Sequence, residues 1–274
     1  MRPEVRSIRL RTGVSLACLI EDRQRDSSGA GNLTDTPLLL VHAWTESRGS
    51  FDRLRPLLAG RRVVAPDLRG HGDSDKTETG YSLPEVADDL AALLDALALP
   101  KAVVIGSSSG GYVGQQLAVS HPERVAALVL IGSPLSLHGR APFADEVDQL
   151  PDPVPESWVR DSLSWFTLFQ PVPKEYLEDR VRDGSKVPAR IWKSSLAGLG
   201  NAVPPTEAGE ILAPTLILWG GRDDLLSRQD EETLAQRIPQ SRLRIYEEAG
   251  HVLLWENPEQ ISSDVNRFLA DIPV

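Results

Sequence analysis

The sequence has little or none of several features that would assign this 274-residue chain to a special class of protein. Cys18 is its only cysteine, so the chain can form neither an intramolecular disulfide nor a metal site built from cysteines. No run of about 18 apolar residues predicts a transmembrane helix. The N-terminal segment MRPEVRSIRL is charged and lacks the apolar core of a secretory signal. We therefore expect a reducing, cytoplasmic compartment and no membrane partner.

Positive charge is also scarce. The chain has 29 lysines and arginines against 39 aspartates and glutamates, which gives a formal net charge of −10. Because phosphate backbones require clustered cations, this balance argues against a nucleic acid as the main partner. The apolar fraction of 41% is typical of a globular protein. The length suits one large domain, with or without an inserted lobe. Nothing in the sequence indicates an oligomeric state.

Short apolar runs alternate with longer amphipathic stretches along most of the chain. This alternation is typical of a mostly parallel sheet flanked by helices, and nearly continuous apolar strands suit a sheet covered on both faces. Residues 6–11 and 14–21 predict an opening hairpin. The polar stretch 23–36 predicts a surface loop, and the apolar stripe of 83–98 predicts a helix. Six further strands are predicted at 37–43, 61–67, 101–107, 124–133, 214–220 and 241–247.

Residues 136–210 interrupt this alternation. They are rich in proline and have helical rather than strand character. We expect them to form a helical cap inserted into a core domain made of residues 1–135 and 211–274.

The sharpest functional motif is Gly106-Ser107-Ser108-Ser109-Gly110, between a predicted strand and a predicted helix. It fits the G-x-S-x-G pattern of a nucleophile elbow, a tight turn that exposes one serine over the sheet. Crowding in this strained turn requires glycine two residues before and after the nucleophile, and only Ser108 has both. The following helix favours negative charge at its N-terminus. The backbone N–H of Ser109 is therefore the expected first donor of an oxyanion hole.

A serine nucleophile needs a base, and histidine has a suitable pKa. Of five histidines, His251 lies in a glycine-preceded loop between the last predicted strand and the last helix. Such a loop can carry the imidazole over the sheet edge. The imidazole in turn needs a carboxylate that fixes its tautomer. Asp223 and Asp224 both follow the strand at 214–220, where open α/β sheets place their chemistry, and position alone does not separate them.

Five blocks of the chain together resemble the α/β-hydrolase superfamily: LLLVHAW, APDLRGHGDSD, VVIGSSSGGYVGQQLA, LILWGGRDDLL and EEAGHVLLWENPE. The resemblance covers essentially the whole chain and is strongest to small bacterial serine esterases and lactonases, including enol-lactonase-like hydrolases. It implies the α/β-hydrolase fold and a catalytic triad of Ser108, Asp223 and His251, because the family's spacing favours Asp223 over Asp224. It implies no metal and no organic cofactor.

The resemblance also indicates the second oxyanion donor. Family members usually have His-Gly after the third strand, and the next residue donates its N–H. This chain reads His42-Ala43-Trp44, so the implied donor is the Trp44 amide. Alanine restricts the backbone more than glycine does, so the direction of that amide depends on the folded structure. The resemblance gives His42 and His71 structural roles in their turns.

The reaction implied is acyl transfer to Ser108, followed by hydrolysis of the acyl-enzyme. Epoxide hydrolases and haloalkane dehalogenases of this fold use aspartate at that position, so serine excludes both. A small-molecule carboxylic ester or lactone is the leading substrate. The alternatives are a C–C bond hydrolase of ring-cleavage products, cofactor-free haloperoxidase activity and a non-catalytic ligand receptor.

Substrate choice is expected to depend on residues 136–210. Trp158, Trp165 and Trp192 are candidates for lining a substrate pocket, although burial in the lobe's own core is the better interpretation for most of them. C–C bond hydrolases of this kind tend to carry a lobe arginine that binds the substrate's carboxylate. The sequence does not distinguish among the four available lobe arginines, Arg160, Arg180, Arg182 and Arg190.

Overall fold

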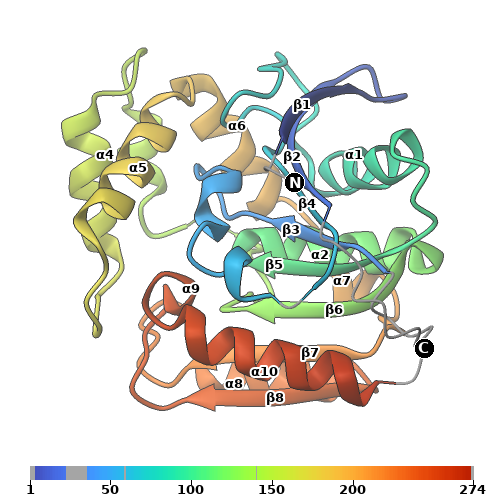
Figure 1. The fold of residues 1–274 in the computed structure, drawn as a ribbon. Helices are drawn as coiled ribbons and strands as arrows, with labels where there is room; N and C mark the ends of the chain where they lie inside the picture. The colour runs from blue at the N-terminus through green and yellow to red at the C-terminus, as the bar shows by residue number, and fades with distance from the viewer. Residues whose placement is uncertain (1–3, 23–35, 59, 140, 273–274) are drawn as a thin grey trace.

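The computed structural model describes residues 4–22, 36–58, 60–139 and 141–272 (Figure 1). Within these ranges, eight strands form one sheet in the order β1-β2-β4-β3-β5-β6-β7-β8. β1 pairs antiparallel with β2 and β2 with β4, and the remaining neighbours are parallel. The strands are β1 (Glu4–Arg9), β2 (Ser15–Glu21), β3 (Leu38–Val41), β4 (Val63–Pro66), β5 (Ala102–Ser107), β6 (Val125–Ile131), β7 (Thr215–Gly220) and β8 (Ser241–Tyr246).

The hairpin and the six further strands predicted from the sequence are all present, each within two residues of its predicted bounds. The helix predicted at 83–98 is α1 (Leu83–Ala96). The surface loop predicted at 23–36 lies outside the described residues, apart from Thr36. The predicted fold class, a mostly parallel sheet flanked by helices, is confirmed.

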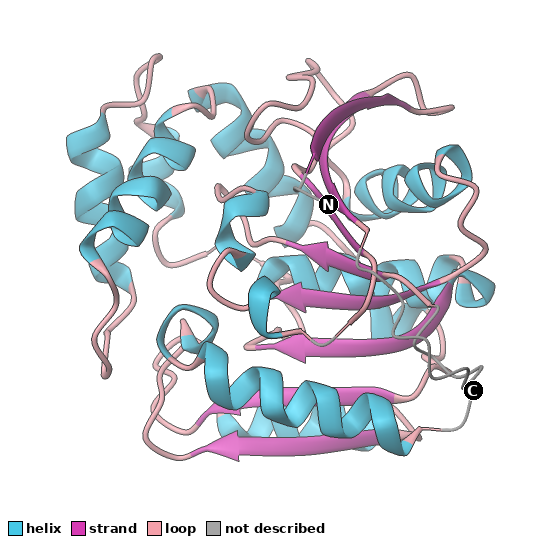
Figure 2. Cartoon of the chain, viewed as in Figure 1, coloured by secondary structure: helices cyan, strands magenta, loops and turns pink. Residues whose placement is uncertain are grey.

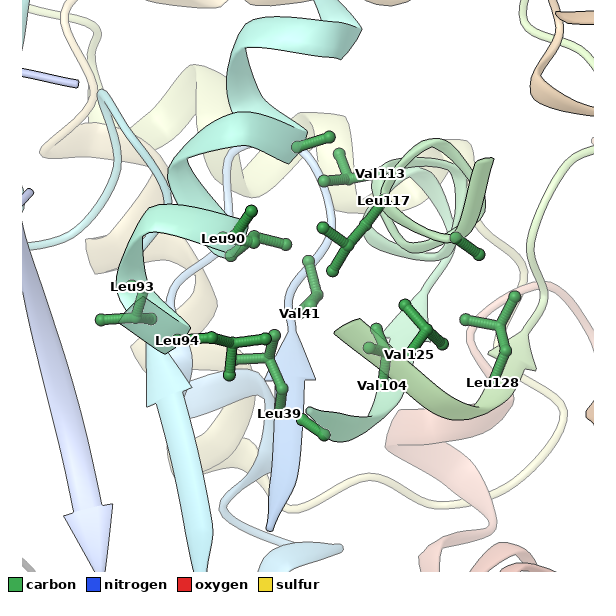
Figure 3. Packing of buried hydrophobic residues seen from close by; sticks show 14 of the residues in the cluster. Leu39, Val41, Leu90, Leu93, Leu94, Val104, Val113, Leu117, Val125 and Leu128 are labelled. Atoms are coloured by element: carbon green, nitrogen blue, oxygen red, sulfur yellow. The ribbon is translucent and has the colours of Figure 1, made fainter. Parts of the chain in front are cut away.

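Helices cover both faces of the sheet, as its apolar strands require. In β3, Leu39 and Val41 contribute to a cluster with α1 and α2, and Figure 3 shows residues of this cluster meeting between helices and strands. Leu38 and Leu40 contribute to a second cluster, with α10. This division follows from the pleat, which turns successive side chains to opposite faces. The helices packed on the sheet are α1, α2 (Ser109–Ser120), α8 (Arg228–Arg237) and α10 (Pro258–Asp271).

The segment between β6 and β7 is helical, and its described residues, 132–139 and 141–214, contain no strand. In Figures 1 and 2 its helices α4 and α5 lie beyond the arrowheads of the parallel strands, at the carboxyl edge of the sheet. A separate apolar cluster here includes the buried Trp192, with Trp158 and Trp165 packed against it. The helices are α3 (Ala144–Asp148), α4 (Glu156–Ser162), α5 (Lys174–Ser185), α6 (Ala189–Gly200) and α7 (Pro205–Ala208).

No helix in the described ranges has both the length and the apolar composition needed to cross a bilayer.

Candidate active site

Ser108 occupies the sharp turn between β5 and α2. Its backbone angles are φ 48° and ψ −124°, so a non-glycine residue adopts a positive φ, a strained state that surrounding structure must enforce. The Ser108 N–H donates to the carbonyl of Ile131 at 2.8 Å, which ties the turn to neighbouring β6. The strand, strained serine and helix predicted from the motif therefore follow one another in the structure.

Two glycines make this turn possible. A Cβ on Gly106 would lie 2.4 Å from the Cα of Gly111, and one on Gly110 would lie 2.3 Å from the carbonyl oxygens of Val41 and His42. Both distances are far shorter than any normal contact, and the obstructing atoms belong to the backbone. Glycine is needed because the start of α2 passes directly against β5 and the end of β3.

Ser108, His251 and Asp223 converge at the carboxyl edge of the sheet. The Ser108 Oγ lies 3.0 Å from His251 Nε2, and His251 Nδ1 lies 2.8 Å from Asp223 Oδ2. Because a carboxylate can only accept, Nδ1 carries the proton and Nε2 is left free to accept from the serine hydroxyl. The side chains of His251 and Asp223 are 3% and 0% exposed, so the contact between imidazole and carboxylate is shielded from water.

Asp223 is held in place through its second oxygen. Its Oδ1 accepts the backbone N–H groups of Leu225 and Leu226, each at 2.9 Å. Asp224 instead accepts from the Thr167 hydroxyl at 3.3 Å. Of the two adjacent carboxylates that the sequence offered, the structure brings Asp223 to the imidazole.

The predicted oxyanion donors are differently placed. The Ser109 N–H belongs to the first residue of α2, beside Ser108. The Trp44 N–H, in contrast, donates to the Oγ of Ser109 at 2.7 Å. The Trp44 amide is therefore engaged by the Ser109 side chain. From the sequence, Ser109 was expected to contribute only its backbone N–H. No local signal predicts this contact, because it joins residues 65 positions apart.

The two structural histidines are buried and neutral. His42 donates from Nδ1 to the carbonyl of Ala43 at 2.8 Å and accepts the Leu68 N–H on Nε2 at 2.9 Å. Burial lowers the pKa of His42 to about 4. Burial likewise lowers the pKa of His71 to about 3, and this ring bonds the carbonyl of Arg69. Both rings hold turns together, as expected from the sequence.

A cavity of about 320 Å³ opens beside Ser108 and His251. Its lining is rich in aromatic rings from both the β3 loop and the helical segment: Trp44, Phe143, Trp165, Phe166 and Trp192. The rings pack on one another, with Trp44 stacked on Phe143 and Phe143 stacked on Trp165 at centroid separations of 5.5 and 4.4 Å. Phe166 also stacks on the imidazole of His251 at 5.2 Å.

Of the three tryptophans predicted as pocket candidates, Trp165 and Trp192 line this cavity. Trp158 is not among its described lining residues and instead packs edge-on against the other two, at 5.5 and 5.2 Å. Trp192 both lines the cavity and packs in the helical segment, because it is also buried in the apolar cluster of that segment. Nothing local in the sequence marks Phe143 as a wall of the cavity.

Of the four candidate arginines in the helical segment, Arg180 is the only one found among the described residues that line this cavity. Its Nε and Nη2 donate to Asp183 Oδ2 at 3.2 and 2.7 Å, and its guanidinium lies 4.6 Å from the centre of the Tyr176 ring. Glu46 lines the same cavity, and burial raises the pKa of its carboxyl. The buried cation is therefore accompanied by two carboxyl groups. The other arginines bond elsewhere, Arg160 to Glu178, Arg182 to Asp179, and Arg190 to backbone carbonyls of residues 76 and 77.

In the described ranges, no three His, Cys, Asp or Glu side chains gather as possible ligands of one metal ion.

Glu231, in the first turn of α8, is a further buried carboxyl group near Asp223. The residue is 0% exposed, and neither carboxyl oxygen finds a hydrogen-bond partner among the described residues. Burial, with a smaller contribution from the charge of Asp223, raises the pKa of Glu231 from 4.5 to about 9. The folded protein therefore holds a proton there that the unfolded chain releases above pH 4.5.

This difference predicts a pH-dependent loss of stability. The protonated Glu231 carboxyl stabilises the folded protein fully below pH 4.5, the pKa of this group in the unfolded chain. This stabilisation is lost as the pH rises from 4.5 to the folded pKa of about 9. The Glu231→Gln variant has no carboxyl group at this position, so its stability does not depend on this proton. Relative to the variant, the parent protein should lose up to about 4 kcal/mol of unfolding free energy between pH 5 and 8. Urea unfolding at both pH values measures this, with the neighbouring Glu232→Gln as control. Equal pH dependence in the parent and Glu231→Gln proteins would contradict the prediction.

Comparison with known proteins identifies relatives over most of the chain. The model of the family described as "Alpha/beta hydrolase family" matches residues 38–264. The 2-hydroxymuconate semialdehyde hydrolase of Pseudomonas sp. (strain CF600) is 30% identical over 267 residues, covering 89% of each chain. The pimeloyl-[acyl-carrier protein] methyl ester esterase of Aeromonas hydrophila is 28% identical over 252 residues, covering 85% of this chain and 94% of the relative.

Among solved structures, the enol-lactonase from Burkholderia xenovorans LB400 superposes with a TM-score of 0.79 at 20% identity, covering 97% of this chain and 100% of that one. At this identity the superposition is evidence of a common fold.

Proposed function

This chain belongs to the alpha/beta hydrolase family and is a hydrolase, and from that premise we propose that it cleaves a small carboxylic ester or lactone through Ser108, His251 and Asp223. The observation that carries the proposal is the hydrogen-bonded series from Ser108 Oγ through the imidazole to Asp223, at 3.0 and 2.8 Å. These distances are within the reach needed for proton transfer from nucleophile to base.

In the proposed reaction, Ser108 Oγ attacks the carbonyl carbon while His251 Nε2 takes the hydroxyl proton. The N–H of Ser109, at the positive end of α2, stabilises the oxyanion. His251 then gives its proton to the leaving alcohol as the C–O bond breaks, which leaves an acyl ester on Ser108. Water, deprotonated by the same imidazole, attacks this ester and releases the carboxylic acid and the free serine. Asp223 stabilises the imidazolium in both steps.

We propose that residues 136–210 act as the cap of this site and select the substrate. The segment supplies Phe143, Trp165, Phe166 and Trp192 to the cavity wall, so it covers Ser108 with apolar surface. A volume of about 320 Å³ is at the small end of ligand pockets, which run from about 300 to 1,000 Å³. This size and lining favour a short, largely apolar acyl or lactone group.

C–C bond hydrolysis is the second candidate, supported by the Pseudomonas relative and by Arg180 in the cavity lining. A substrate carboxylate would need the charge of this arginine. Asp183 already accepts from two of the guanidinium nitrogens. This compensation weakens the attraction for an anionic substrate, and we therefore favour a neutral ester or lactone.

A panel of substrates with covalent labelling tests the proposal. Aryl esters of increasing acyl length, a small lactone and a vinylogous ring-cleavage product are assayed side by side, and a fluorophosphonate probe is followed by peptide mass mapping. We expect labelling at Ser108, hydrolysis of the short ester and the lactone, and falling kcat/KM as the acyl chain outgrows the cavity. Turnover of the ring-cleavage product alone would favour the C–C hydrolase. Labelling without turnover of any substrate would favour a ligand receptor.

A further inference from the structure

The contact between Trp44 and Ser109 alters the oxyanion site. The Trp44 N–H has one proton to donate, and at 2.7 Å from nitrogen to oxygen that proton is used by the Ser109 hydroxyl. A substrate oxygen therefore cannot receive it while the contact persists. One of the two backbone donors implied by the resemblance is unavailable to the substrate in this structure.

Trp44 is held in this position from two sides. Its indole N–H donates to the Ser195 hydroxyl at 2.9 Å, and its ring packs edge-on against Trp192 at 4.9 Å. Both partners belong to α6, far from the β3 loop in sequence. Ala43, which stands where glycine is usual in the family, leaves the backbone before Trp44 less freedom to rotate. Turning the amide toward the substrate would disturb these contacts.

The Ser109 hydroxyl has a donor of its own. A hydroxyl that accepts one hydrogen bond through its oxygen still carries an O–H proton that can be donated. In the part of the chain that the structure describes, no acceptor receives this proton. Ser109 lines the same cavity as Ser108, His251 and Trp44, so the proton has access to the substrate space.

We propose that the hydroxyl of Ser109 is a catalytic residue: its oxygen accepts the Trp44 N–H, and its O–H donates to the oxyanion formed at the attacked carbonyl, beside the N–H of Ser109 itself. This inference rests on the acyl transfer proposed above. The Trp44 amide then acts through the hydroxyl, because accepting a hydrogen bond polarises an O–H and makes it a stronger donor. A rotatable hydroxyl thus replaces a fixed amide as the second oxyanion donor.

The test removes the Ser109 hydroxyl in one variant that shortens the side chain and in a second variant that is compared with a hydroxyl-bearing residue of the same shape. Ser109→Ala deletes it, and Ser109→Thr and Ser109→Val form a matched pair of almost equal size in which only threonine keeps an O–H. Each variant is assayed for kcat and KM on a short aryl ester, for inhibition by a boronic acid that forms a tetrahedral adduct on Ser108, and for thermal unfolding.

We expect kcat to fall about 10²- to 10³-fold in Ser109→Ala and Ser109→Val, the loss typical of a removed oxyanion donor. Boronate affinity should fall by a similar factor, while KM changes little and Ser109→Thr recovers most of the activity. A structural role would instead lower the unfolding temperature and would not separate threonine from valine.

Two different failures can be told apart. Suppose that the wild-type protein hydrolyses the ester and that kcat of Ser109→Ala and Ser109→Val equals or exceeds the wild-type value. The Ser109 hydroxyl then either makes no contribution to catalysis or obstructs the oxyanion hole. This inference is then overturned while the proposed function stands. If the wild-type protein neither hydrolyses the ester nor is labelled at Ser108, both are overturned.

Discussion

Replacement of Ser108 by alanine should lower the turnover number for a short aryl ester by at least about 10⁴-fold. The substitution removes the attacking oxygen and leaves the amide of Ser109 and the cavity intact, so substrate still binds and only slow, unassisted hydrolysis by water persists. Steady-state kinetics, supported by burst analysis of the wild-type acyl-enzyme, measures the effect.

Ser120→Ala is a suitable control, because it removes a hydroxyl from the far end of the same helix. It should leave turnover within a few fold of wild type. Unfolding temperatures of both variants should match the parent protein, because neither change empties a packed apolar site. Retention of full esterase activity in Ser108→Ala would refute the nucleophile assignment and with it the reaction sequence.

The second large effect is expected from Asp223→Asn, which should lower kcat by about 10⁴-fold while preserving the fold. The reason lies in the two backbone N–H groups of Leu225 and Leu226, which both donate to Asp223 Oδ1. In the variant, the amide oxygen is the only atom that can accept them. The amide NH₂ must then face His251 Nδ1, which turns that nitrogen into an acceptor and moves the ring proton to Nε2. An Nε2–H cannot take a proton from Ser108.

Asp224→Asn provides the matched control one residue away. Its carboxylate contacts Thr167 rather than the imidazole, so kcat should stay within a few fold of the parent value. Comparing kcat for the two asparagine variants checks the assignment directly. A large loss in Asp224→Asn combined with a mild effect in Asp223→Asn would mean that the neighbouring carboxylate holds the histidine in solution.

In the helical segment between β6 and β7, the same side chains pack the segment and line the cavity. Trp192 is buried in the apolar cluster of this segment and also forms part of the cavity wall. Trp44, in the loop after β3, is joined to α6 of this segment through its indole bond to Ser195. A substitution in this part of the cavity wall therefore also changes the contacts between α6 and the loop after β3. Trp44 and Trp192 therefore take part both in the packing of the segment and in the cavity wall.

Local patterns in the sequence were sufficient to predict the sheet and the strained turn at Ser108. Strand positions follow from apolar runs because a strand covered on both faces must be apolar along its length. Ser108 is distinguished from Ser107 and Ser109 by Gly106 and Gly110, since only these spacings relieve the backbone crowding of the turn. These constraints act over a few residues, and reading the chain in order is enough to find them.

Tertiary structure alone decided the contacts between distant segments. The geometric choice of Asp223 over Asp224, the selection of Arg180 among four arginines and the placement of Trp158 outside the cavity lining all depend on where side chains point after packing. The engagement of the Trp44 amide by Ser109 depends on the path of two loops and on α6 behind them. No local pattern contains this information, because neighbouring residues of the same chemical type become different only when a folded backbone gives each its own surroundings.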